Sequence, residues 1–353
     1  MSDSIGSDTG GMYASNASAR EIAAHLAGAA SVVILTHSKP DGDAVGSTLA
    51  IARALASAGK RLTLAYAGPL PYWLPALAGE TPYSHVSTNA PFAPPEPEAI
   101  VLCDTGSWAQ LEEVADWLAP RRDRACVVDH HRSGDADVAP RRLIEVEAAS
   151  TCEPMAEVCA ALLKVDSPAR FSADLASPLY VGLATDTGWF RHSNVRPSTL
   201  RLASALLEAG VDHPSIYALI EQSERPARIR LMARALSSLE LHAGEQVAVL
   251  TLMQQDFHET RADPSDSGGF ADMVLAIATV KVVAVVTEAF TPEGKGPLTK
   301  VSFRSKEGER AVDVNSIAKQ FGGGGHIRAA GARPRGDLHT IRAGVIAALS
   351  GAV

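Results

Sequence analysis

One histidine and two aspartates stand close together near the start of the sequence: His37, Asp41 and Asp43. They follow an apolar run, residues 32–35, that predicts a buried strand, and they lead into a small-residue helix predicted over residues 44–58. Carboxylates crowded at the end of a buried strand repel one another and lose solvation. Because a metal ion removes both problems, this spacing predicts a metal site.

Three further segments end in residues that can bind a metal. Asp104 and His130 follow predicted strands at residues 99–103 and 125–128, and Asp186 follows a largely apolar helical segment. Strands that alternate with helices predict an α/β fold with a parallel sheet. Sites in such folds form beyond the carboxyl ends of the strands. We therefore expect these side chains to converge with the first group, although they lie far apart in the sequence.

The complete candidate set contains two imidazoles and four carboxylates: His37, Asp41, Asp43, Asp104, His130 and Asp186. Four carboxylates balance the charge of two divalent cations, with one carboxylate bridging them. Oxygen-rich ligation favours Mn²⁺, with Mg²⁺ and Co²⁺ as alternatives, and two metals about 3.5–4 Å apart promote in-line displacement at phosphorus. Singly, each residue has another explanation, such as a helix cap for Asp104 or a core position for His130. Six such residues at strand and helix ends favour the metal site.

A run of four glycines, residues 322–325, precedes His326 and Arg328. It lacks the Lys-Ser/Thr of a P-loop and the spacing of a dinucleotide fingerprint. One interpretation is a linker. The other is a helix start whose free backbone N–H groups hold an oxyanion, with His326 and Arg304 as further donors. The residues that follow the glycines favour phosphate recognition.

The length of 353 residues predicts two domains. The chain carries 32 basic and 40 acidic residues, and its net charge of −8 argues against a protein that binds long nucleic acid. Its four cysteines are interpreted as reduced, buried thiols. It has no nearly uncharged segment of about 20 residues, so we expect a cytoplasmic protein without a membrane partner.

Two local features interrupt the regular pattern. Residues 1–16 are rich in Ser, Gly and Asp and lack the basic and apolar regions of a signal peptide, so they predict a flexible tail. Pro178 lies within the helical segment before Asp186 and predicts either a helix start at Ser177 or a kink.

The motifs around these residues resemble those of the DHH family of phosphoesterases, over nearly the whole chain. The naming triplet corresponds to residues 129–131, and the glycine run resembles the signature of the associated C-terminal domain. The resemblance implies that one metal binds His37 and Asp41, the other binds Asp43, His130 and Asp186, and Asp104 bridges them and serves catalysis. It also implies that His131 is catalytic and assists at the phosphate, while Asp129 orients its neighbours.

The resemblance further implies that the two domains have different roles. A catalytic DHH domain over residues 17–220 would bind the two metals, a linker and connecting helix would span 221–240, and a smaller α/β domain with a mixed sheet would occupy 241–353. The active site would lie in the cleft between the domains. The predicted substrate-binding residues all lie in the second domain: Arg304, Ser305, Gly323, Gly324, Gly325, His326 and Arg328.

The expected activity is that of the nanoRNase/pAp-phosphatase group, in which a di-metal-activated hydroxide cleaves short oligoribonucleotides and 3′-phosphoadenosine 5′-phosphate (pAp). One alternative is a cyclic di-AMP or pApA phosphodiesterase. A pyrophosphatase is disfavoured by the glycine-rich signature, and a non-catalytic nucleotide sensor is disfavoured by the intact ligand set. The sequence leaves open the physiological substrate, the polarity of attack, the native metal and the oligomeric state, with a homodimer as one alternative.

Overall fold

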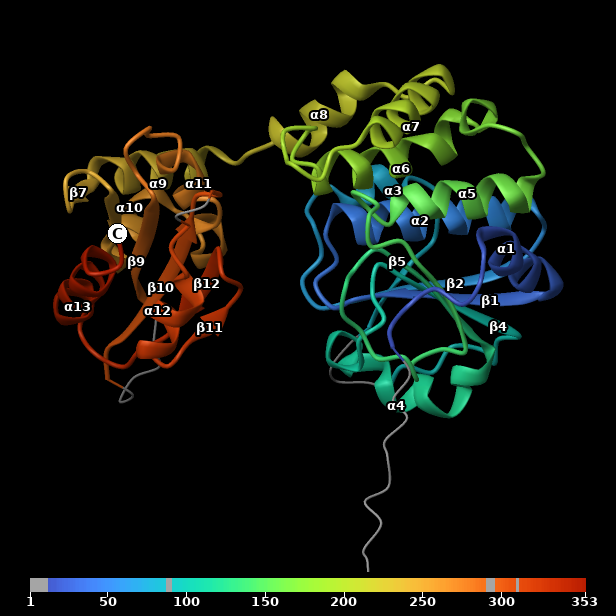
Figure 1. Ribbon diagram of the computed structural model, residues 1–353, viewed down its shortest axis with the longest axis horizontal. Coiled ribbons are helices and arrows are strands. Elements are labelled where there is room, and N and C mark those ends of the chain that lie inside the picture. Colours follow the sequence, from blue (N-terminus) through green and yellow to red (C-terminus); the bar gives the residue numbers. More distant parts are fainter. Residues whose placement is uncertain (1–11, 87–90, 290–295, 309–310) are drawn as a thin grey trace, which may run out of the picture. The chain divides into compact units, whose positions relative to one another are not determined.

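The computed structural model of the protein describes residues 12–86, 91–289, 296–308 and 311–353. The chain forms two compact units, Met1–Gln222 (unit 1) and Ser223–Val353 (unit 2). Each unit contains its own six-stranded sheet (Figure 1). The stretch expected to be a linker and connecting helix, residues 221–240, contains α9 (Pro226–Ser237), and the buried Leu231 and Ala235 of α9 belong to a core of unit 2. This helix is therefore an integral part of unit 2.

The sheet of unit 1 is parallel throughout, as the sequence predicts. Its spatial order is β3-β2-β1-β4-β5-β6, so the order of the strands reverses at β1, which pairs with both β2 and β4. Such a reversal opens a crevice at the carboxyl ends of the strands. The strands are β1 (Ser31–Thr36), β2 (Arg61–Ala67), β3 (Ser84–Val86), β4 (Ala99–Cys103), β5 (Ala125–Asp129) and β6 (Arg141–Ile144).

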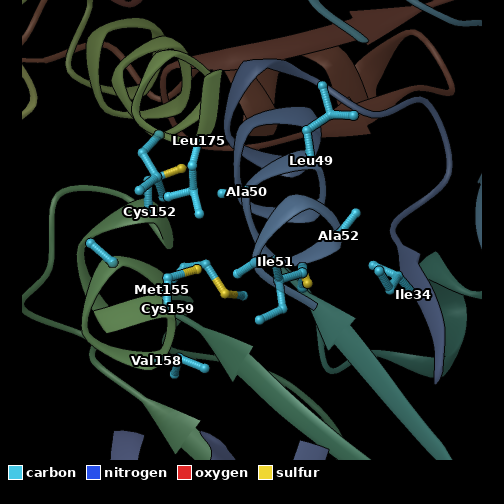
Figure 2. Packing of buried hydrophobic residues seen from close by; sticks show 14 of the residues in the cluster. Ile34, Leu49, Ala50, Ile51, Ala52, Cys152, Met155, Val158, Cys159 and Leu175 are labelled. Carbon is cyan, nitrogen blue, oxygen red and sulfur yellow. The ribbon is translucent and has the colours of Figure 1, made fainter. Parts of the chain in front are cut away.

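Helices cover both faces of this sheet (Figure 1). One face packs on α1 (Ala19–Gly28), α2 (Gly42–Ser57), α5 (Cys152–Leu163) and α6 (Ala173–Asp186), and the other packs on the short α4 (Ala115–Leu118). Figure 2 shows Met155 and Cys159 of α5 beside Ile51 of α2 within the larger core. The remaining helices of unit 1 are α3 (Leu74–Ala78), α7 (Pro197–Glu208) and α8 (His213–Glu221).

Two glycines allow α2, α5 and α6 to approach one another closely. A Cβ atom at Gly46 would lie within 3.0 Å of the Pro178 carbonyl oxygen, and one at Gly182 would lie equally close to the Cys152 sulfur. Real Cβ atoms essentially never show such a contact, so a larger residue at either position would force the helices to shift. The close approach sets the start of α2 and the start of α5 side by side, which matters for the site described below.

Helix α6 continues through Pro178. It begins at Ala173, after an N-cap at Ser172 whose hydroxyl accepts a hydrogen bond from the backbone of Leu175. The predicted start at Ser177 is therefore wrong. Proline has no N–H and cannot donate to the carbonyl four residues earlier, that of Asp174. The Nη1 atom of the buried Arg53 donates to that carbonyl instead, at 2.5 Å, so the gap in the helical ladder is filled by a side chain.

The segment before α1 is held against the sheet from Tyr13 onwards. Ser15 and Asn16 exchange hydrogen bonds with the backbone of the edge strand β6. The tail expected over residues 1–16 therefore does not extend through residues 13–16, because polar side chains there satisfy the open edge of a strand. The rest of that expectation, residues 1–11, lies outside the described residues.

Unit 2 contains a mixed sheet in the order β11-β12-β10-β9-β8-β7. Among the described strands of this sheet, only β8 and β9 pair in parallel. One face packs on α9, α10 (Gln254–Thr260) and α11 (Phe270–Val274), and the other packs on α12 (Val314–Gln320) and α13 (Leu338–Ser350). The strands are β7 (Glu240–His242), β8 (Val247–Leu252), β9 (Val282–Ala289), β10 (Leu298–Ser305), β11 (Gly324–Gly325) and β12 (Ala329–Ala332).

Two predictions concern the whole chain. The four cysteines are all buried and unpaired, which confirms their interpretation as core thiols. Among the described helices, none combines the length and the apolar character needed to cross a membrane.

Arg53→Ala should lower the free energy of unfolding of unit 1 by about 2–3 kcal/mol, because it removes the donor to the Asp174 carbonyl and to the Leu77 and Ala78 carbonyls. In a Pro178→Ala background the new amide can donate to the Asp174 carbonyl, so the same substitution should cost about 1 kcal/mol less. Urea unfolding followed by tryptophan fluorescence measures this, since all four tryptophans lie in unit 1.

Arg20→Ala, on the exposed side of α1, is the control and should change the unfolding free energy by less than about 0.5 kcal/mol. An equal cost of Arg53→Ala in both backgrounds would show that the proline gap is not what Arg53 fills.

Candidate metal centre

The six predicted metal ligands lie together at the carboxyl edge of the unit 1 sheet. Three of them directly follow the ends of β1, β4 and β5, two lie at the start of α2, and one is the last residue of α6. In that order they are His37, Asp104, His130, Asp41, Asp43 and Asp186. Convergence of strand ends at the switch point thus brings together residues that are up to 149 positions apart, from 37 to 186.

His130 faces three carboxylates. Its Nε2 atom lies 3.8 Å from an oxygen of Asp43, 3.7 Å from Asp104 Oδ1 and 3.5 Å from an oxygen of Asp186. These distances are too long for good hydrogen bonds. Atoms bound to one cation at about 2.1 Å lie about 3.0–3.4 Å apart, so these distances are close to those between ligands of one cation. Ligand atoms of Asp43, His130 and Asp186 all lie within 4.8 Å of one another.

A second group forms around His37. Its Nε2 atom lies 3.8 Å from an oxygen of Asp41 and 3.5 Å from Asp104 Oδ2. Asp104, whose side chain is only 2% exposed, therefore directs one oxygen toward each histidine. This grouping is the one that the DHH resemblance implies, with Asp104 between two centres.

The backbone of Asp104 has a left-handed conformation, with φ of 59°. Aspartate tolerates this region better than most residues, but the conformation still costs free energy. It occurs where β4 ends, and the Asp104 amide still donates to the Val128 carbonyl of β5 at 2.9 Å. The turn thus directs the carboxylate back over the strand ends.

Both metal-facing histidines have a fixed ring orientation. The Nδ1 atom of His37 lies 3.0 Å from the Ser38 carbonyl oxygen, and that of His130 lies 3.2 Å from the Ala148 carbonyl oxygen. A carbonyl only accepts hydrogen bonds, so each Nδ1 carries a proton and each Nε2 is the nitrogen that faces the carboxylates. This is the arrangement in which histidine binds a metal.

The start of α5 holds two of the carboxylates. The hydroxyl of Ser150 and the amide of Thr151 donate to Asp43, at 2.7 and 2.6 Å, and the Thr151 hydroxyl donates to Asp104 at 2.9 Å. Sequence reasoning missed both residues. Serine and threonine near a helix start are commonly caps, so their types carry no signal for a metal site, and the Thr151 hydroxyl makes no cap bond here.

Burial makes this group of carboxylates costly without a cation. It raises the pKa of Asp104 well above the usual range, with the charge of Asp43 as a further cause. It also raises the pKa of Asp186 to about 8, again helped by Asp43. Acidic groups with such raised pKa values ionise at neutral pH only when a positive charge lies nearby. Buried oxygens and two free imidazole nitrogens fit divalent cations such as Mn²⁺ or Mg²⁺.

Asp129 and His131 form a hydrogen-bonded pair next to the predicted ligands, and the His131 Nδ1 atom also lies 3.6 Å from Asp104 Oδ1. Asp129 is fully buried, and its Oδ1 atom accepts hydrogen bonds from His131 Nδ1 at 2.8 Å and from the amides of His130 and His131. This bond raises the pKa of His131 to about 9. It also leaves Nε2 of the half-exposed ring available for a ligand.

Three of the predicted substrate-binding residues lie close together in unit 2. Arg304, near the end of β10, is paired in register with Ala329 at the start of β12, beside Arg328 and His326. The Arg304 guanidinium lies 3.8 Å from an Asp272 carboxylate and remains 41% exposed. Arg328 pairs with Glu307 and is 52% exposed. Both cations therefore retain contact with solvent.

Ser305 differs from its neighbour Arg304. Side chains alternate between the faces of a strand, and Ser305 shares the buried face of β10 with Phe303, against α12 and α13. Its hydroxyl is buried and makes no hydrogen bond within the described residues. The two side chains thus leave β10 on opposite faces.

The sequence suggested that the glycine run begins a helix, but it does not. It ends α12 and enters β11, the first strand of a short hairpin with β12. Glycine has low helix propensity and readily adopts the left-handed conformation seen at Gly322, with φ of 71°. The amide of Gly323 donates to Ala318, and that of Gly325 donates to Asn315 Oδ1 at 3.0 Å. These two amides are therefore engaged within the fold.

Comparisons with known proteins agree with this geometry. The DHH family N-terminal domain matches residues 31–183, and the DHHA1 domain matches residues 244–349. Over 312 residues the chain is 32% identical to the Bifunctional oligoribonuclease and PAP phosphatase NrnA of Thermus thermophilus, an alignment that covers 86% of this chain and 84% of that protein. The chain belongs to the DHH family.

Solved structures share the fold of this DHH-family chain. An exopolyphosphatase-related protein from Bacteroides fragilis superposes with a TM-score of 0.83 at 24% identity, covering 94% of this chain and 96% of that one. An exonuclease RecJ bound to manganese superposes with a TM-score of 0.55 at 18% identity, covering 96% and 95%. The α/β fold predicted from the sequence is confirmed.

In the metal-free protein, the free energy of unfolding of unit 1 should decrease as the pH rises. An unfolded aspartate has a pKa of about 3.9, and the raised pKa of Asp186 in the folded, metal-free protein means that the folded state holds its proton more tightly. This contribution is present below about pH 4 and is lost as the pH approaches 8. The raised pKa of His131 acts in the same direction above about pH 6.5.

Melting temperatures of chelator-treated protein, followed by tryptophan fluorescence, should therefore decrease from pH 5.5 to pH 8. Added Mn²⁺ should raise the melting temperature more at pH 8 than at pH 5.5. A stabilisation by Mn²⁺ that does not depend on pH would contradict the crowded-carboxylate interpretation.

Asp104→Asn should reduce the occupancy of both metals, because one side chain serves both histidine groups. Asp41→Asn should reduce only one, giving about one tightly bound ion per chain. Metal content after gel filtration in Mn²⁺-free buffer distinguishes the two, with the exposed Asp116→Asn as a control. Retention of two ions by Asp104→Asn would rule out the bridging role.

Proposed function

We propose that this protein is a divalent-metal-dependent phosphoesterase that hydrolyses short oligoribonucleotides and pAp. The single observation that carries this proposal is the position of Asp104, which directs one carboxylate oxygen toward each of two histidine–aspartate groups. The relative from Thermus thermophilus, whose name gives both activities, supports the choice of substrates. A sensor without catalysis would have no need of two such groups sharing a ligand.

His37, Asp41 and Asp104 would hold one cation, and Asp43, His130, Asp186 and Asp104 would hold the other. Two divalent cations polarise a phosphate ester and lower the pKa of water, which is the chemistry needed for its hydrolysis. Mn²⁺ is the ion we favour, given the donor set and the manganese bound to the RecJ relative in fold. The hydrogen bonds from Ser150 and Thr151 keep the carboxylates oriented before any cation binds.

His131 is the residue that we assign to the phosphate itself. The hydrogen bond from Nδ1 to Asp129 fixes its tautomer and turns Nε2 away from the protein interior. Because its pKa is raised to about 9, His131 also carries a proton on Nε2 at neutral pH. This proton can be donated to a phosphate oxygen, where negative charge develops in the transition state. Asp129 acts through His131, since its own carboxylate is fully buried.

Unit 2 would supply recognition of the nucleotide. The exposed guanidinium groups of Arg304 and Arg328, together with His326, are the donors that we assign to phosphate. Gly323, Gly324 and Gly325 would shape the hairpin that presents them, and the buried Ser305 would support the strand.

Substrate length tests the proposal directly. Because the net charge is −8 and few cations are assigned to phosphate, kcat/KM should be highest for pAp and dinucleotides and should fall at least about tenfold beyond five nucleotides. The measurement is a series of 5′-labelled oligoribonucleotides from two to twenty-four residues with Mn²⁺ at fixed salt, with pApA, cyclic di-AMP and pAp in parallel.

Addition of a chelator is the control and should abolish all hydrolysis. Equal or rising efficiency with length would contradict the short-substrate proposal, and a preference for cyclic di-AMP would replace it with a cyclic dinucleotide phosphodiesterase.

A further inference from the structure

Tyr13 reaches the catalytic edge of unit 1 from outside the part of the chain that matches the DHH family, which begins at residue 31. Its hydroxyl donates to Oδ2 of the buried Asp129 at 2.5 Å. Burial and the neighbouring Asp129 charge raise the pKa of Tyr13 far above its usual value. The phenol therefore keeps its proton and remains a hydrogen-bond donor.

Two glycines leave room for the Tyr13 ring. A Cβ atom at Gly106, two residues after Asp104, would lie within 3.0 Å of the Tyr13 hydroxyl. One at Gly134 would lie equally close to the ring carbon that carries the hydroxyl. Glycine at both positions thus accommodates a tyrosine that comes from a distant part of the chain.

The backbone around Tyr13 is anchored independently of the ring. The Ser15 hydroxyl accepts from the Ile144 amide at 2.6 Å, and Asn16 Oδ1 accepts from the Arg142 amide at 2.7 Å. The Asn16 amide donates in return to the Arg142 carbonyl at 2.9 Å. These bonds fix the segment along β6, so the position of Tyr13 does not depend on its own hydrogen bond alone.

Tyr13 supplies the hydrogen-bond donor for the second carboxylate oxygen of Asp129. Oδ1 of Asp129 accepts from the His130 and His131 amides and from His131 Nδ1, whereas Oδ2 accepts only from Tyr13 among the described residues. A buried carboxylate oxygen without a donor is costly. Without Tyr13, the carboxylate could regain a partner by rotating, and it would then no longer hold the His131 ring in place.

We propose that Tyr13 is a positioning residue for the reaction, which fixes the Asp129 carboxylate and through it the orientation of His131. The inference rests on the proposed function for its catalytic consequence, but the placement of Tyr13 stands on contacts that do not involve a substrate. It extends the active site to the N-terminal segment, which sequence reasoning had assigned to a tail.

Tyr13→Phe tests the role, because it removes only the hydroxyl and keeps the ring between the glycines. We expect kcat for pApA to fall about tenfold, with KM within twofold of the wild type and two Mn²⁺ ions still bound per chain. In an Asp129→Asn background the same substitution should change kcat by less than twofold, since the two residues act on His131 together.

A spectroscopic measurement separates this inference from the proposed function. In Mg²⁺-loaded protein labelled with ¹⁵N-histidine, Tyr13→Phe should shift the ring nitrogen resonances of His131 and leave those of His242, in unit 2, unchanged. Unshifted His131 resonances would overturn the positioning role, whatever the activity of the wild type. A wild-type protein without activity on pApA or pAp would overturn only the proposed function.

Tyr66→Phe is the matched control. Tyr66 is a buried tyrosine of unit 1, and its hydroxyl forms a hydrogen bond with the Thr48 hydroxyl at 2.8 Å and not with Asp129. It should leave kcat, KM and the His131 resonances unchanged. Wild-type kcat in Tyr13→Phe, loss of bound Mn²⁺, or effects of Tyr13→Phe and Asp129→Asn that simply multiply would each contradict the proposal.

Discussion

Buried carboxylates without a counter-charge are the constraint on which unit 1 depends. Asp43 and Asp104 are almost completely buried, and Asp186 stands beside them at the end of α6. Their mutual repulsion and lost hydration oppose folding of the metal-free chain. The fold offsets part of this cost with hydrogen bonds from the start of α5 and with two oriented histidines, and cations would offset the rest. Stability and metal binding are therefore properties of the same few side chains.

The scaffold meets this constraint through close helix packing and through hydrogen bonds at the helix ends and at Pro178. Gly46 and Gly182 let three helices approach at distances that other residues would forbid. That packing sets Asp43 against the first turn of α5, where backbone amides and hydroxyls are available. Arg53 completes the hydrogen bonding of α6 at Pro178 and so keeps the helix that ends in Asp186 continuous. The geometry of the site thus depends on how α2, α5 and α6 pack in the core of unit 1.

The sequence predicted the parallel sheet and the convergence of the six candidate ligand residues, because apolar strands that end in Asp or His carry a strong local signal. It did not identify Tyr13, Ser150 or Thr151 as parts of the site. Their partners lie 47 to 116 positions away, and tyrosine, serine and threonine have many roles that involve no ligand. The glycine run misled for a related reason. Glycine permits many backbone paths, and only the pairing with β12 decides which one is taken.

The contacts of Ser15 and Asn16 with β6 have a consequence for solubility. β6 is the outermost strand on its side of the sheet, and an outermost strand offers unpaired amides and carbonyls to other chains. Here the Ser15 hydroxyl bonds to the Ile144 amide and carbonyl, and the Asn16 side chain accepts from the Arg142 amide. The backbone amides of Asn16 and Ala17 donate to the Arg142 carbonyl. The segment that brings Tyr13 to the active site therefore also protects the β6 edge from pairing with other chains. Removal of this segment would disturb the positioning of His131 and lower the solubility of the protein together.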